Sequence, residues 1–155
     1  MPVEFEFISP EDKPALLALN TPEFLAAVKP ATIDLGYKVH TVASHEEFSS
    51  RFTQIQYQVV FIEETFCCSS ITDNLTLHNV QTMPMNQRRH AVILLLGSSF
   101  QTLHPMQAYQ MSVHAVVNPQ ELPSIVQIIQ KCLADNNLFL HLYRDTQLRI
   151  AQGKT

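Results

Sequence analysis

His90-Ala-Val-Ile-Leu-Leu-Leu-Gly97 decides the fold, because six consecutive apolar residues stand between a basic tripeptide, Arg88-Arg89-His90, and a Gly-Ser-Ser turn. A run without a polar face is typical of a strand that is covered on both sides. Short β-branched runs alternate with amphipathic stretches of helical length on either side of it. This alternation predicts an α/β fold with a doubly wound, five-stranded parallel sheet.

The remaining strands and helices are expected at regular intervals along the chain. Strands are predicted at residues 15–19, 37–42, 59–62, 91–96 and 113–117. Thr21 and the Ser44 capping box each begin a helix, and Pro30 predicts a kink or local break in the first of these. A third helix is expected between a cap at residues 70–73 and Met83, and a fourth within residues 98–112, with Leu103 and Met106 facing inward.

The last helix is expected to begin near Leu122-Pro123 and to continue to Ile150. At about 1.5 Å per residue it would be roughly 40 Å long, whereas a typical strand spans about 17–20 Å. The apolar side chains of its distal half must therefore be covered by something other than the sheet. A homodimer is predicted through the apolar positions Phe139, Leu142, Tyr143 and Ile150, the alternative being a helix that folds back on its own domain.

Three segments follow from these assignments. Residues 1–14 are interpreted as an N-terminal arm or an extra edge strand, residues 15–135 as the domain, and residues 136–155 as an extension of the last helix. A chain of 155 residues is about one domain by length, and its apolar core needs no disulfides.

Composition narrows the classes of function. Ten basic and fourteen acidic residues give a net charge of −4, without a basic patch that would fit a phosphate backbone, so nucleic-acid binding is not expected. Three cysteines form no disulfide framework, and no stretch resembles a signal peptide or a membrane span. A cytoplasmic protein without membrane attachment is therefore expected.

The order and spacing of these elements resemble the receiver domain of bacterial response regulators over roughly residues 14–133. Leu35-Gly36-Tyr37 ends the first helix, and Val116-Val117-Asn118-Pro119 ends the fifth strand, as in that family. The resemblance implies a flavodoxin-like fold. It also implies a phosphoacceptor pocket at the carboxyl ends of the strands, which can be checked residue by residue.

Receivers use an acidic pair for Mg²⁺, an acceptor aspartate, a hydroxyl residue and a lysine that contacts the phosphate. The corresponding positions are Leu19 and Asn20 for the pair, Glu63 for the acceptor, Leu96 for the hydroxyl residue and Asn118 for the lysine. All five depart from the family pattern. The resemblance therefore implies a degenerate pseudo-receiver that has lost its phosphotransfer chemistry.

Two details of this pocket stay open at the level of sequence. Glu63 can be a carboxylate at the end of a loop or a permanent mimic of the phosphorylated state, and the first interpretation is favoured because the aromatic switch position holds Ala115. By analogy with the family, the Asn118-Pro119 peptide is predicted to be cis, which costs an X–Pro bond only about 0.5–1 kcal/mol.

Other candidate sites have a structural interpretation that is favoured over a chemical one. Cys67-Cys68 could bind a soft metal or respond to oxidation, yet no second pair lies at zinc-ligand spacing. The seven histidines include no i, i+4 pair on a predicted helix. Gly97-Ser98-Ser99 lacks the second glycine of a nucleophile elbow. Neither an enzyme nor a bound metal or cofactor is expected.

The function expected from these observations is a non-phosphorylatable interaction module in bacterial signal transduction, with an unidentified signalling protein as its partner. By the resemblance, the partner-binding face is made by the fourth helix, the fifth strand and the last helix, with Gln101, His104, Gln107, Gln110 and Gln120 exposed on it. Two alternatives remain: a small-ligand sensor that uses the vacated crevice, and the N-terminal regulatory fragment of a larger response regulator.

Overall fold

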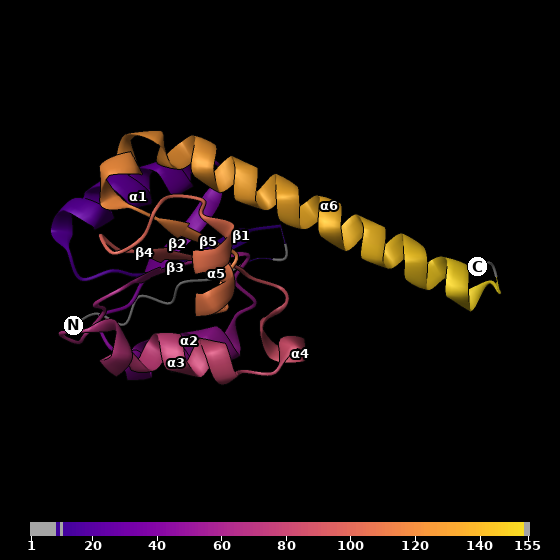
Figure 1. Ribbon diagram of the computed structural model, residues 1–155, viewed down its shortest axis with the longest axis horizontal. Coiled ribbons are helices and arrows are strands. Elements are labelled where there is room, and N and C mark those ends of the chain that lie inside the picture. Colours follow the sequence, from indigo (N-terminus) through magenta and orange to yellow (C-terminus); the bar gives the residue numbers. More distant parts are fainter. Residues whose placement is uncertain (1–8, 10, 154–155) are drawn as a thin grey trace.

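A computed structural model describes residue 9 and residues 11–153 of the chain. Five strands alternate with helices (Figure 1), and the predicted α/β class is confirmed. The strands are β1 (Lys13–Ala18), β2 (Tyr37–Thr41), β3 (Val59–Glu63), β4 (Val92–Leu96) and β5 (Ala115–Val117). The helices are α1 (Pro22–Asp34), α2 (His45–Gln54), α3 (Leu75–Thr82), α4 (Met85–Arg88), α5 (Pro105–Met111) and α6 (Ile125–Ala151), with short 3₁₀ turns η1 (Ile71–Asp73) and η2 (Pro119–Ser124).

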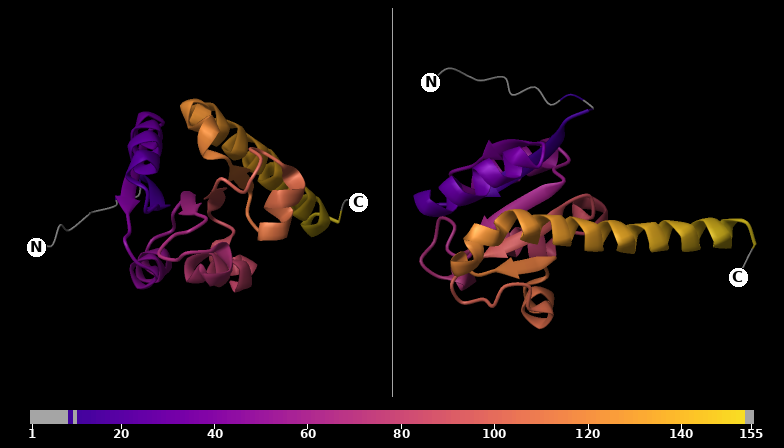
Figure 2. Two further views of the ribbon diagram at one scale, coloured as in Figure 1. Left: turned by 60° about the vertical axis from the view of Figure 1, so that its left-hand side comes forward. Right: turned by 90° about the horizontal axis from the view of Figure 1, so that it is seen from above.

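All neighbouring strands pair in parallel, in the order β2-β1-β3-β4-β5. This order places β3 at the centre of the sheet, with the crossover helices on both faces (Figure 2). The strands β3 and β4 are buried along their whole length, which explains why residues 91–96 contain no polar position.

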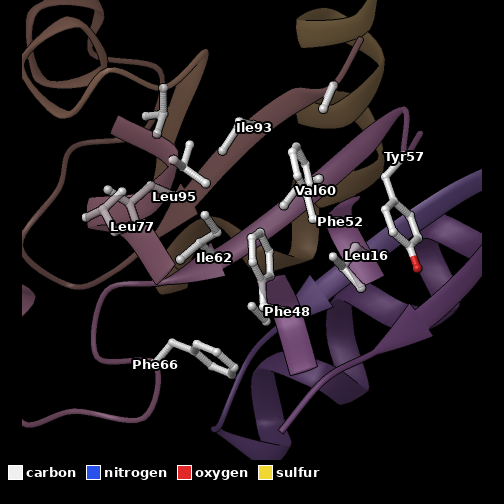
Figure 3. Close-up of a cluster of buried hydrophobic side chains, with 14 of the residues drawn as sticks. Leu16, Phe48, Phe52, Tyr57, Val60, Ile62, Phe66, Leu77, Ile93 and Leu95 are labelled. Carbon is white, nitrogen blue, oxygen red and sulfur yellow. The ribbon is translucent and has the colours of Figure 1, made fainter. Parts of the chain in front are cut away.

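Alternate residues of each strand belong to two separate hydrophobic clusters. Leu16, Val60, Ile62, Ile93 and Leu95 pack with α2 and α3 on one face, around Phe48, Phe52, Phe66 and Leu77 (Figure 3). Leu17, Phe61, Leu94 and Val117 pack with α1 and α6 on the other face. Because successive side chains of a strand point to opposite faces, both faces of the sheet must be apolar, as the sequence predicts.

Some local predictions were wrong, and each error has a physical reason. The helix expected within residues 98–112 is only α5, because Pro105 occupies its first turn and His104 Nδ1 caps it by accepting the N–H of Gln107 (3.3 Å). Leu103, with φ 60°, packs against the cluster that α1 and α6 cover, as predicted, whereas Met106 points outward with 57% of its surface exposed.

The start of the third helix and the proline in the first helix also differ from expectation. Asn74 caps α3, since its Oδ1 accepts the N–H of Leu77 at 3.0 Å, whereas residues 71–73 form only the turn η1. The helix α1 is continuous across Pro30. Ser44 caps α2 as predicted, and its Oγ accepts the N–H of Glu47 at 3.1 Å.

The helix α6 extends well beyond the sheet (Figures 1 and 2). Its first half is packed on the sheet through Ile125, Ile128, Ile129 and Cys132. The strands run toward the end where α6 begins, so the distal half of α6 projects past their amino-terminal edge. In the part of the chain that the structure describes, no helix is long and apolar enough to cross a membrane.

The N-terminal arm was predicted over residues 1–14, and most of it lies outside the described residues. The strand β1 already begins at Lys13, two residues earlier than expected. Pro14 belongs to it, and its carbonyl accepts the N–H of Gln58 at 2.8 Å.

Candidate functional site

The five positions that the resemblance assigns to a phosphoacceptor pocket lie at the carboxyl edge of the sheet. Leu19 and Asn20 follow β1, Glu63 and Leu96 end β3 and β4, and Asn118 follows β5. Parallel strands bring their carboxyl ends together, so the sequence correctly placed these residues at one edge. Their side chains, however, make contacts of a kind that the family pattern does not suggest.

Glu63 is the central residue of this edge, and only 4% of its surface is exposed. Its Oε1 accepts the backbone N–H groups of Asn20 (2.9 Å) and Thr21 (3.0 Å). Its Oε2 accepts the hydroxyls of Thr21 (2.9 Å) and Thr65 (3.3 Å). Four donors therefore saturate both oxygens of the carboxylate, which compensates for its removal from water.

This arrangement fixes the entry into α1. Thr21 is the N-cap residue of α1, but its side chain makes no capping bond and instead donates to Glu63. The carboxylate thus lies next to the first turn of the helix, where negative charge is favourable. The extra methylene of glutamate, compared with aspartate, extends the carboxylate farther from β3, toward the backbone that follows β1.

Asn20 connects this edge to the loop between β3 and α3. Its Oδ1 accepts the N–H of Cys67 at 3.1 Å, and its Nδ2 donates to the carbonyl of Thr65. Cys67 has φ 54°, a left-handed conformation that side chains other than glycine seldom adopt. An uncharged amide that both donates and accepts suits this position, whereas a carboxylate could only accept.

Leu19 and Leu96 contribute apolar packing to the same edge. Leu19 is 4% exposed and Leu96 is fully buried, and both belong to the cluster that α1 and α6 cover. Neither side chain can hold a cation or contact a phosphoryl oxygen, because neither carries a polar atom. These are core positions in this chain.

Asn118 replaces the family's lysine with a local structural role. Its Nδ2 donates to the carbonyl of Phe100 (2.8 Å), and its Oδ1 accepts the N–H of Gln120 (2.9 Å). The Asn118-Pro119 peptide is trans, so the prediction of a cis bond was wrong. Asn118 is the N-cap of η2 and Pro119 lies in its first turn, a position that suits proline in an ordinary trans geometry.

Glu64 is the residue of this edge that sequence reasoning missed. Its side chain lies across Gly97, and a Cβ on Gly97 would be 2.6 Å from the Cβ of Glu64. Gly97 also donates its N–H to the carbonyl of Val117 at 3.0 Å. The glycine is therefore needed for a close approach between two loops. Its position directly after an apolar strand was the only signal in the sequence.

The other candidate groups lie apart from one another. Cys67 is exposed and Cys68 half-buried, and partial burial is the main factor that raises the pKa of both thiols. A raised pKa reduces the thiolate fraction on which reactivity and soft-metal binding depend. Among the described residues, no three His, Cys, Asp or Glu side chains are grouped in a way that could hold a metal ion.

The predicted partner-binding residues divide into a local network and two separate positions. Gln101, His104 and Gln107 bind one another, since Gln107 Oε1 accepts the N–H of Gln101 (2.7 Å) and Gln107 donates its own N–H to His104. Gln110 is exposed on α5, and Gln120 is exposed on η2, next to Asn118. Three of the five predicted residues are thus joined by hydrogen bonds.

A cavity of about 590 Å³ lies between α4, α5 and α6. Leu103, Ala108, Phe139 and Leu140 are among its apolar lining residues. Volumes of this order are typical of sites that bind small molecules or anchor side chains. The cavity is on the face where the family resemblance places partner binding, and away from the crevice at Glu63.

Polar groups line the opposite wall of this cavity. Arg88 is buried and donates to the carbonyls of Val80 (2.9 Å) and Ser112 (2.7 Å), which compensates its charge. His114 Nδ1 accepts the N–H of Ile93 at 3.0 Å. Burial of the bonded ring nitrogen, together with the charge of Arg88, lowers the pKa of His114 to about 4, although part of the residue faces solvent.

The distal half of α6 exposes the apolar side chains that the sequence predicts on one side of the helix. The exposed fractions are 67% for Phe139, 58% for Leu142, 49% for Tyr143 and 70% for Ile150. We call these four residues the α6 stripe. All four side chains are at least 49% exposed, so folding back of the helix, the alternative prediction, does not occur in this structure.

Neither a protein-family model nor a curated protein sequence matches the chain. Several solved structures, by contrast, are similar to the chain in fold. NtrX from Brucella abortus, solved in complex with ADP, has a TM-score of 0.67 at 11% identity, with 93% of this chain and 30% of NtrX covered. A fusion that carries the trimeric coiled coil of yeast Spc42 has a TM-score of 0.61 at 13% identity and covers 94% of this chain and 92% of its own.

A response regulator from Thermotoga maritima is similar over nearly its whole length. Its TM-score is 0.58 at 13% identity, with 79% of this chain and 98% of that chain covered. At such low identity the similarity concerns the fold alone. The order of the five parallel strands and these similarities together show that the chain has the receiver-like fold of response regulators.

Proposed function

We propose that this protein is a non-phosphorylatable pseudo-receiver that acts as a protein–protein interaction module in bacterial signal transduction. The observation that carries the proposal is the buried Glu63 carboxylate, whose two oxygens accept four hydrogen bonds from its own chain. A phosphoacceptor needs a carboxylate oxygen that is free to attack and a cation beside it.

The neighbours of Glu63 support the same conclusion. Leu19 and Leu96 carry no ligand atoms, and Asn20 and Asn118 use their amides within the chain. Mg²⁺ prefers carboxylate oxygens and water. An interaction role is supported by a receiver-like fold in which the phosphoacceptor groups are replaced. It is also supported by two apolar surfaces, the cavity between α4, α5 and α6 and the α6 stripe.

We further propose that the α6 stripe holds two copies together. Eight side chains, four from each copy, are between 49% and 70% exposed, so covering all of their exposed surface would stabilise a dimer by about 7–15 kcal/mol in total. Association costs about 4–15 kcal/mol in lost translational and rotational freedom. The two ranges overlap, so we expect a dimer that dissociates on dilution.

One alternative has specific support. NtrX is a longer protein, of which this chain spans 30%, and α6 projects away from the domain as a helix would that leads into another segment. The chain would then be the regulatory part of a larger response regulator. The length of the natural reading frame distinguishes this alternative from an independent module.

The phosphorylation test uses a small phosphodonor with Mg²⁺ and intact-mass spectrometry. We expect no gain of a phosphoryl group, because the acidic pair and the lysine are missing and Glu63 is saturated. A receiver that retains its acceptor aspartate serves as the positive control. A phosphoryl group that maps to Glu63 would refute the proposal.

The dimer test compares two substitutions on α6. Phe139→Asp places a charge in the α6 stripe, whereas His141→Asp places one at an exposed position two residues away, on another side of the helix. Light scattering over a concentration series should show a dimer for the unsubstituted protein and for His141→Asp, and a monomer for Phe139→Asp. Equal association of the three proteins would contradict a dimer through this stripe.

A further inference from the structure

The α6 stripe continues the face of α6 that packs on the sheet. Ile150 follows Cys132 by eighteen residues, and Tyr143 follows Ile125 by the same interval, which is about five complete turns of an α-helix. Cys132 and Ile125 are buried against the sheet. The α6 stripe therefore points to the same side as the protein's own sheet, into the space beyond its amino-terminal edge (Figure 1).

This direction restricts how a second helix can cover the stripe. Packed helices lie about 8–10 Å apart, which is close to the distance between a helix and the sheet beneath it. A second helix packed on the α6 stripe thus lies at the level of the sheet, and one of its ends faces the amino-terminal edge of that sheet. If it ran in the same direction as α6, its preceding residues would have to pass through the sheet of the first copy.

We propose that the α6 helices of two copies pack in opposite directions, so that the last turn of each reaches the amino-terminal edge of the other copy's sheet. This inference rests on the proposed dimer and specifies its geometry. Residues 136–151 span about 24 Å, and this overlap keeps both domains apart at the two ends of the helix pair. Phe139 of one copy then lies near Ile150 of the other, and the two Tyr143 residues lie near the twofold axis.

The amino-terminal edge of the sheet carries hydrogen-bond donors that suit the end of a helix. A groove of about 790 Å³ is present there, between the distal half of α6 and the residues that precede β3 and β4. Its lining includes the amides of Gln56, Gln58 and Asn86 and the guanidinium of Arg89. The last four carbonyls of a helix lack partners within it and carry partial negative charge, so amide and guanidinium donors complement them.

The charge of the incoming helix end also agrees with this groove. Arg149, the cation in the last turn of α6, already pairs with Asp145 at 3.3 Å. When that turn enters the groove, its free carbonyls are therefore accompanied by a cation whose charge Asp145 already partly neutralises.

Disulfide cross-linking tests the direction of the helices. Cys67→Ser and Cys68→Ser remove the accessible thiols, while Cys132 stays in place because it is buried and burial raises its pKa to about 11. In this background, Phe139→Cys and Ile150→Cys are made as separate proteins with tags of different mass. The background protein and a His141→Cys variant are the controls for cross-links outside the α6 stripe.

Under mild oxidation, we expect a strong cross-link when Phe139→Cys and Ile150→Cys are mixed, and about tenfold less when either is oxidised alone. Efficient cross-linking of each variant with itself would show helices that run in the same direction and would overturn the inference, while the dimer itself would stand. A dimer without any of these cross-links would overturn it as well. A monomer at every concentration would refute the proposed dimer too.

The groove is tested separately through Arg89. Arg89→Ala should raise the dimer dissociation constant about fivefold or more, because the helix end loses a cationic donor. Lys29→Ala, an exposed position on α1, is the matched control and should leave the constant unchanged. Equal constants for the two variants would place the partner's last turn outside this groove.

Discussion

Removal of the Glu63 carboxylate should strongly destabilise the fold at the carboxyl edge. In Glu63→Ala, the N–H groups of Asn20 and Thr21 lose their acceptor at the entry into α1. A buried donor left without a partner costs about 1–3 kcal/mol; both of these bonds are only partly buried, so about 2–6 kcal/mol is the upper range of the predicted loss. That is a large share of the roughly 5–15 kcal/mol by which most domains are stable.

Glu63→Gln removes the negative charge of the side chain but keeps its size and shape. The amide oxygen can still accept both N–H groups, and the threonine hydroxyls can rotate to accept from its nitrogen. Only the difference between charged and neutral hydrogen bonds is lost, about 1–2 kcal/mol. The matched control is Glu64→Ala, because the Glu64 carboxylate accepts only a long bond from the N–H of Ser99 (3.4 Å), and its loss should cost less than about 1 kcal/mol.

Urea unfolding followed by circular dichroism measures all three variants. With a slope of about 2 kcal/mol per molar urea, Glu63→Ala should lower the midpoint by roughly 1–3 M, and Glu63→Gln by less. The order of stability should be Glu64→Ala, then Glu63→Gln, then Glu63→Ala. If Glu63→Ala and Glu64→Ala had the same midpoint, the hydrogen bonds at Glu63 would not hold this edge together, and the interpretation of Glu63 as a structural carboxylate would be refuted.

Two more predictions concern the pH dependence of stability and the approach between two loops. The pKa of His114 is lowered to about 4, and that of His90 is lowered by burial. As the pH falls below about 6.5, these histidines therefore bind protons in the unfolded chain before they do so in the folded chain. Stability should be full above that pH and decline toward pH 4, and His114→Gln should make the decline shallower in thermal melts, whereas an unchanged slope would exclude this histidine as a cause. Gly97→Ala should destabilise by about 1–3 kcal/mol through contact with the side chain of Glu64, and much of that loss should disappear in the double variant with Glu64→Gly, which also removes the Cβ of residue 64; additive effects in the urea midpoints would contradict this contact.

The sheet could be predicted from the sequence because its evidence is local. The apolar run at residues 91–96 has no polar face, and this alone requires helices on both sides of the sheet. The long last helix was equally visible, since its apolar positions recur at helical spacing without a break. Both features depend on periodicity within one segment, which a single sequence displays.

The errors arose where a nearby residue competed with the expected signal. Pro105 and His104 mark the start of α5, whereas the prediction placed the helix only somewhere within residues 98–112. Asn74 stands one residue after a plausible cap at residues 70–73, and the structure uses the asparagine. Such choices between adjacent caps differ by only about 1 kcal/mol, so contacts elsewhere in the fold decide them.

The contacts at the carboxyl edge were the least predictable part of the site. The sequence predicted a loss of phosphotransfer from Leu19, Leu96 and Asn118, but it could not show what Glu63 binds. Its donors follow β1, forty-two and forty-three residues away in the chain. The contact between Glu64 and Gly97 is likewise a contact between separate loops. Contacts of this kind leave no periodic trace in a single sequence.

The replacements at the carboxyl edge support one another, and this has a consequence for the proposed function. Glutamate at position 63 extends to the backbone after β1, and an asparagine at position 20 binds both Thr65 and Cys67, so the loops after β1 and β3 are tied together. A phosphate would have to displace these internal partners at the expense of their hydrogen bonds. Under the proposed function, the edge is closed by the same groups that stabilise it, and we expect that an aspartate at position 63 alone would create neither a cation site nor a phosphate site. Under the proposed function, the surfaces for partners and for the second copy are accordingly set by the fold itself, without a modification that switches them.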